Sequence, residues 1–102
     1  MSLKRDYICL NIKINRLSQK LSQQELANKA GFPKSKISKI ENKNTSLPID
    51  DLFLISKALN ISPQDLFPPG DISEEELRMS IEEIEKRISN AAADLARSLL
   101  QK

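Results

Sequence analysis

Residues 22–42 read SQQELANKAGFPKSKISKIEN, and this stretch decides the fold. Ser22 and Glu25 match a capping box, in which the serine hydroxyl and the glutamate carboxylate each bind the backbone N–H of the other residue. Gly31 follows the last apolar residue of the segment, and the residue after a helix end often needs a positive φ, which glycine tolerates. We therefore expect a short helix over residues 23–30 that ends in a glycine turn.

A second short helix follows the turn. Pro33 is tolerated in the first turn of a helix, where its missing N–H costs nothing, so this helix is expected from Pro33 or Lys34 to about Asn42. Ile37 and Ile40 lie three residues apart and face inward. The outward residues are Lys34, Ser35, Lys36, Ser38 and Lys39. Two short helices joined by a tight glycine turn are typical of a helix-turn-helix.

Helical spacing of apolar residues predicts further helices on both sides of this pair. One precedes it over about residues 6–19, one begins at Pro48 and ends near Asn60, and a short one begins at Ser62. The stripe expected on the first helix is Leu10, Ile14, Leu17 and Leu21. Only 4% of residues are aromatic and only two are glycine, which favours an all-α fold over a β-sandwich or barrel.

The run Pro68-Pro69-Gly70 is the clearest boundary in the chain, because two prolines and a glycine do not continue a helix. Ser73 and Glu76 form a second capping box directly after it. We expect a five-helix domain over residues 1–67, a linker over residues 68–72 and one long helix over residues 73–102.

The long final helix carries a heptad pattern, in which apolar residues recur at alternating steps of four and three. Such a stripe needs a partner: it can fold back on its own domain, pair with a second subunit or bind another protein. The Pro-Pro-Gly break and the acidic surface of the helix favour pairing with a second subunit. The residues expected at that interface are Leu77, Ile81, Ile84, Ile88 and Leu95.

Charge divides the chain into a basic and an acidic half. Residues 1–50 hold ten Lys or Arg against four Asp or Glu, whereas residues 51–102 hold six against ten. This asymmetry suggests that the first half faces a polyanion. Three lysines precede the first acid, Glu41, on the helix that follows the glycine turn, and a polar, basic face on a clamped helix suits the major groove of DNA.

The residue types that most enzymes need are scarce. The chain has no histidine, and its one cysteine, Cys9, stands between Ile8 and Leu10, where we expect a buried structural thiol. Without a glycine-rich phosphate loop or a metal-ligand cluster, we expect no enzyme, no cofactor and no metal site. No apolar run approaches the ~18 residues of a membrane span, and the N-terminus lacks a signal-peptide pattern, so we expect a cytoplasmic protein.

Five stretches together resemble one known family: SQQELA at 22–27, AG at 30–31, ISKIEN at 37–42, ALNIS at 58–62 and LF at 66–67. They are similar to the lambdoid phage repressor and Cro family, also called the XRE-type helix-turn-helix. The similarity spans roughly residues 8–67 and preserves the order and spacing of five helices and the residues that begin and end them. It implies a lambda-repressor-like domain that binds double-stranded DNA.

The resemblance assigns roles to individual positions. Lys34, Ser35 and Lys39 stand where family members place side chains that contact bases. The positions that match contacts to the DNA backbone are Arg16, Gln23, Lys36, Ser38, Asn42, Lys43 and Asn44. Arg16 and Glu41 also match a salt bridge that would orient the reading helix, with Arg16 along the phosphates; an exposed bridge of this kind contributes only ~0–1 kcal/mol.

Three positions depart from the family pattern. Lys20 replaces a frequent glycine, Asn15 replaces an apolar residue, and Pro33 replaces a polar helix cap. The implied function is a homodimeric transcription regulator, most simply a repressor, on a palindromic operator. An antitoxin, or a controller of a restriction-modification module, whose final helix also binds a partner protein is the alternative.

Overall fold

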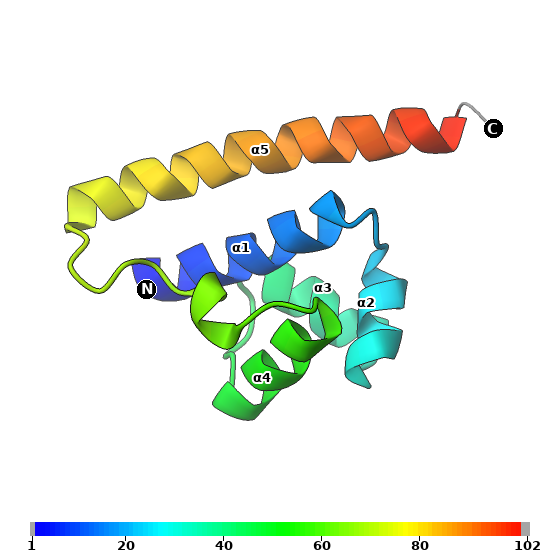
Figure 1. Cartoon of the computed structure of the whole chain (residues 1–102), viewed down its shortest axis with the longest axis horizontal. Coiled ribbons are helices and arrows are strands. Elements are labelled where there is room, and N and C mark those ends of the chain that lie inside the picture. Colours follow the sequence, from blue (N-terminus) through cyan, green and yellow to red (C-terminus); the bar gives the residue numbers. More distant parts are fainter. Residues whose placement is uncertain (1, 101–102) are drawn as a thin grey trace.

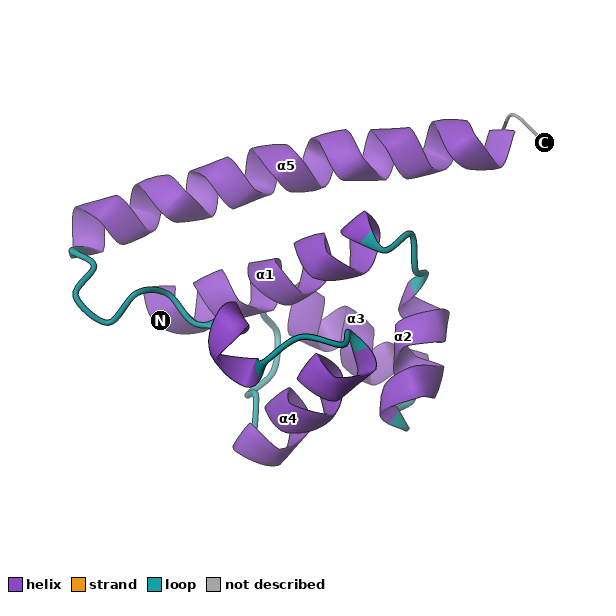
Figure 2. Cartoon of the chain, in the orientation of Figure 1, coloured by secondary structure: helices purple, strands orange, loops and turns teal. Residues whose placement is uncertain are grey.

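The computed structural model describes residues 2–100, and this part of the chain contains helices and no strands (Figure 1, Figure 2). The expected all-α fold is therefore confirmed. The elements are α1 (Leu3–Ser18), α2 (Gln23–Ala30), α3 (Lys34–Glu41), α4 (Ile49–Ala58), the 3-10 helix η1 (Pro63–Leu66) and α5 (Glu74–Leu100). Helix α1 begins before the expected start near residue 6, because Ser2 caps it and accepts the Arg5 N–H at 3.2 Å.

Local sequence signals set the helix ends. The N–H of Glu25 donates to the Ser22 hydroxyl at 3.0 Å, and the N–H of Ser22 donates to the Glu25 carboxylate at 2.9 Å, which completes the expected capping box. Gly31 ends α2 with a φ of 79°. The capping box at Ser73 and Glu76 also forms, at the start of α5. These contacts use only neighbouring residues, which is why the pattern alone located them.

The first core lies between α1, the α2–α3 pair, α4 and η1. Its buried side chains are Ile8, Cys9, Ile12, Leu26, Ala27, Ile37, Ile40, Leu52, Ile55, Leu59 and Leu66. Cys9 is fully buried, and burial raises the pKa of its thiol, so the expected structural thiol is confirmed. This core fixes α3 against the rest of the domain, because Ile37 and Ile40 both enter it.

Helix α1 is buried on two faces, which corrects the expected single stripe. Ile8, Cys9 and Ile12 enter the first core, and Leu21 packs against that core as well. The second core lies on the other face of α1 and contains Leu10, Ile14, Leu17, Ile84 and Ile88, with Tyr7, Ile81, Ala91 and Leu95 packed around it. Of the four residues expected on one stripe, Leu10, Ile14 and Leu17 therefore face the second core, whereas Leu21 faces the first.

Helix α5 folds back along α1, and the two helices run in the same direction (Figure 1). The structure shows the fold-back alternative and not the favoured pairing of the heptad stripe with a second subunit, because Leu77, Ile84 and Ile88 are buried within the chain. Ile81 and Leu95 are partly buried against the same core. Each fully buried Leu or Ile contributes about 1.5–3 kcal/mol, so this packing is a strong reason for α5 to stay on α1.

Candidate DNA-binding surface

Helix α3 is held from one side and open on the other. Ile37 and Ile40 are buried at its inner face, whereas Lys34, Ser35 and Lys39 are exposed. Pro33 stands at the N-cap with φ −66° and provides no side-chain hydrogen bond to the helix. The result is an eight-residue helix whose position is fixed by the core and whose polar side chains point away from it.

A buried polar network connects α3 to α1 and α2. The Nε of Arg16 donates to Glu41 Oε2 at 2.7 Å, and its Nη2 donates to Glu41 Oε1 at 2.9 Å. The Nη1 of Arg16 donates to the Leu21 carbonyl at 2.8 Å, and the Gln23 side-chain amide donates to Glu41 Oε1 at 3.1 Å. The network therefore ties the C-terminal end of α3 to the last turn of α1 and the first turn of α2.

Burial of this pair corrects the role expected for Arg16. Only 7% of the Arg16 side chain and none of the Glu41 side chain is exposed. An arginine in this position does not lie along a phosphate backbone, and the pair is not the weak exposed bridge expected. Removing one partner of a buried pair leaves a buried charge and costs about 3–5 kcal/mol. Arg16 and Glu41 thus position the surface without belonging to it.

The loop after α3 is anchored by its backbone. The N–H of Asn44 donates to the Lys39 carbonyl at 2.9 Å, and the N–H of Lys43 donates to the Ile40 carbonyl at 3.0 Å. The Nη2 of Arg5 donates to the Lys43 carbonyl at 3.2 Å. Asn42 and Asn44 are exposed and Lys43 is partly exposed beside α3. Sequence reasoning missed Arg5, and no local pattern links it to a residue so distant along the chain.

Comparison with known proteins agrees with this geometry. Residues 12–66 match the model of HTH_3, a helix-turn-helix family. The chain belongs to the HTH_3 helix-turn-helix family. Among solved structures it is similar to the crystal structure of a hypothetical transcription factor, NHTF, from Neisseria, with 24% identity, a TM-score of 0.62, and coverage of 74% of this chain and 84% of that chain. This likeness concerns the fold. No curated protein matches the sequence.

Family membership makes the chain a DNA-binding regulatory protein, and the helix-turn-helix is formed by α2 and α3. Within residues 2–100, no three His, Cys, Asp or Glu side chains gather as a metal site requires. In the same part of the chain, no helix combines the length and apolar character needed to cross a bilayer.

Lys36 belongs to the edge of the helix-turn-helix rather than to its open face. Its Nζ lies 2.9 Å from Asp51 Oδ2 on α4 and 4.5 Å from the centroid of the Phe32 ring. The ion pair and the cation–π contact direct this lysine toward α4. The flanking DNA contact expected of Lys36 is therefore not the contact that this structure shows. Ser38, the other flanking residue, is partly exposed.

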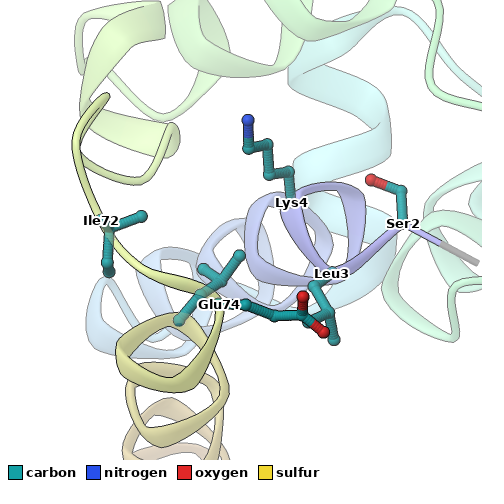
Figure 3. Close-up of a pocket in the computed structure, with 6 residues that line it drawn as sticks. Ser2, Leu3, Lys4, Ile72 and Glu74 are labelled. Carbon is teal, nitrogen blue, oxygen red and sulfur yellow. The ribbon is translucent and has the colours of Figure 1, made fainter.

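One hollow of the helix-turn-helix protein lies at the junction of α1 and α5. It is lined by Ser2, Leu3, Lys4, Ile72, Glu74 and Leu77 (Figure 3). The hollow is open, and its polar groups come from side chains of mixed type with no convergent arrangement. It is best understood as the place where the linker before α5 meets the start of α1.

Proposed function

We propose that this chain is a sequence-specific transcription regulator that inserts α3 into the major groove of double-stranded DNA. The observation that carries the proposal is the asymmetry of α3: Ile37 and Ile40 are buried, and the opposite face presents exposed Lys34, Ser35 and Lys39. Lysine donates to guanine O6 and N7, and serine donates or accepts at base edges. These three side chains are the ones we assign to base contacts.

Contacts to the DNA backbone would fix the register of α3. We assign them to Ser38, to Asn42, Lys43 and Asn44 in the loop after α3, and to Gln23 at the start of α2. The Gln23 amide nitrogen donates one N–H to Glu41 and carries a second, which we assign to a phosphate. The N-terminus of α2 adds a favourable dipole for an anion. Such contacts supply affinity without sequence information.

Repression by a homodimer on a palindromic operator is the simplest mode of action. Two copies double the base contacts, and a two-fold dimer places two α3 helices about 34 Å apart on one face of the duplex. A dimer bound at such an operator would block a promoter without any further domain. Because the heptad of α5 packs on α1, we assign this pairing to another surface. We place this activity in the cytoplasm.

A second candidate function is an antitoxin or restriction-modification controller that also binds a partner protein. One observation favours it: Leu99 and Leu100 at the end of α5 are 60% and 85% exposed. In that case the end of α5 would recruit the partner while α3 holds DNA. A partner that co-purifies with the full chain and is lost from the Leu99→Ser, Leu100→Ser variant would favour this second function.

Selection from random and genomic DNA fragments, repeated across a salt series, tests the proposed regulator. We expect recovery of a palindrome with half-sites about one helical turn apart, and an affinity that falls steeply as salt rises. Recovery of nothing above non-specific binding would contradict sequence-specific reading by α3.

A further inference from the structure

The outer face of α4 is apolar where a surface helix is usually polar. Phe53 is 54% exposed and Leu54 is 45% exposed. Asp50 and Lys57 are also exposed on this helix. The four residues stand at positions i, i+3, i+4 and i+7, and this spacing places them on one side of an α-helix. The buried side of α4, with Leu52 and Ile55, is already filled by the first core.

Two opposite charges mark the ends of this face. Asp50 lies in the first turn of α4 and Lys57 in the last turn, about 10 Å apart along the helix axis. Neither forms an ion pair with any residue of the described part of the chain. A helix with a negative start, an apolar middle and a positive end is complementary to an antiparallel copy of itself.

We propose that a second copy of this chain docks on the outer face of α4, with its own α4 antiparallel and the two-fold axis between positions 53 and 54. In this arrangement Phe53 packs on the partner's Leu54, and Asp50 faces the partner's Lys57. Because the axis repeats each contact, the interface holds two apolar contacts and two opposite-charge pairs. A parallel copy would instead place Asp50 beside the partner's Asp50.

The surroundings of α4 fit this occupant. Phe53 and Lys57 border a surface hollow with Asn60, Ile61 and Pro63, which leaves room for a side chain of the second copy. Helix α4 lies on the side of the domain away from α5 (Figure 1), so the fold-back of α5 does not obstruct the face. The pair between Lys36 and Asp51 joins α3 to α4, so the same interface would set the spacing of two α3 helices.

The size of the face predicts a weak dimer. One ten-residue helix cannot bury the ~1,200–2,000 Å² of a stable interface, and smaller interfaces belong to reversible complexes. The dimer is therefore expected to form at high concentration in solution and to be completed when two copies share one DNA. This inference rests on the dimer of the proposed function but names a different surface from the heptad of α5.

Sedimentation velocity on the full chain, from about 10 µM to about 1 mM and without DNA, tests the interface. The variants are Asp50→Lys, Lys57→Asp and the double swap, with Glu82→Lys on α5 as a matched charge reversal away from α4. Each single swap creates two like-charge pairs and is expected to weaken dimerisation at least about 10-fold. The double swap is expected to recover it, and Glu82→Lys to leave it unchanged.

The proposal would be overturned by a wild-type chain that stays monomeric throughout, by single swaps that dimerise like the wild type, or by a double swap that does not recover. Equal weakening by Glu82→Lys would do the same, since it would show an effect of net charge alone. Circular dichroism of every variant checks that the helices remain folded. Because no DNA is present, a failed operator selection and a failed dimer are separate outcomes.

Discussion

The guanidinium of Arg16 donates two hydrogen bonds, of 2.7 and 2.9 Å, to the buried carboxylate of Glu41. The pair joins the last turn of α1 to the last residue of α3. Planar guanidinium and carboxylate groups fix both distance and angle, so this pair restricts rotation of α3 as well as its separation from α1. The helix that we propose to read DNA is therefore oriented by a contact that never touches DNA.

Glu41→Gln should destabilise the domain by about 3–5 kcal/mol, because Arg16 would then be buried without a carboxylate. Urea unfolding followed by circular dichroism measures the change. Asp94→Asn is the control, since it removes the exposed pair between Asp94 and Arg97 and should change stability by less than about 1 kcal/mol. If both variants changed the free energy of unfolding by a similar small amount, the buried Arg16–Glu41 pair would matter no more to stability than the exposed pair, which would contradict this prediction.

Lys20→Gly should stabilise the protein by about 1 kcal/mol. Lys20 has a φ of 58°, where a side chain is strained and glycine is not. The same substitution at Lys13, inside α1, should destabilise by about 1 kcal/mol because glycine weakens a helix interior. Thermal unfolding compares the two variants. A loss of stability at both positions would mean that Lys20 makes a contact worth more than its strain.

Ile84→Ala should lower stability by about 2–5 kcal/mol, because Ile84 is buried between α5 and α1. Leu99→Ala, at the exposed end of the same helix, should change stability little. Chemical unfolding and sedimentation are measured together. If Ile84→Ala instead dissociated a dimer and left stability unchanged, the heptad of α5 would pair between subunits after all.

Glu25 should contribute to stability in a pH-dependent way. The backbone N–H and the hydroxyl of Ser22 stabilise its charged form and hold its pKa below the usual 4.5. Since the unfolded chain then binds the proton more readily than the folded one, this contribution is present above pH 4.5 and is lost as pH falls through the lower, folded pKa. Below pH 4.5, the free energy of unfolding of Glu25→Gln should therefore fall less steeply with decreasing pH than that of the wild type. An unchanged acid limb would contradict the role of the capping box.

Sequence patterns predicted the features that depend on neighbours. The capping boxes at Ser22 and Ser73 and the glycine end of α2 follow from contacts three to five residues apart, and all formed as expected. The positive φ at Lys20 explains why a glycine is common there in the resembled family. The all-α architecture and the family membership could also be predicted from the sequence, because both depend on patterns among residues close together in the chain.

Features that depend on distant partners were predicted less well. The heptad of α5 shows that Leu77 to Leu95 must be buried, yet periodicity does not name the surface that buries them. A matching series of steps runs along α1 at Leu3, Tyr7, Leu10, Ile14 and Leu17, and α5 packs there. Likewise, the pairing of Arg16 with Glu41 was expected, but its burial depends on how α2 covers it. The assignment of Lys34, Ser35 and Lys39 to bases stays a prediction.

The most direct test of base reading by α3 is a binding-specificity profile of Lys39→Ala over every single-base variant of the selected operator, at fixed salt. Lys86→Ala, an exposed lysine on α5, is the matched control and should leave the profile unchanged. We predict that Lys39→Ala loses about 1–3 kcal/mol on the operator and relaxes specificity at one position in each half-site. An equal loss on all sequences would make Lys39 a phosphate contact and would contradict the proposed reading by α3.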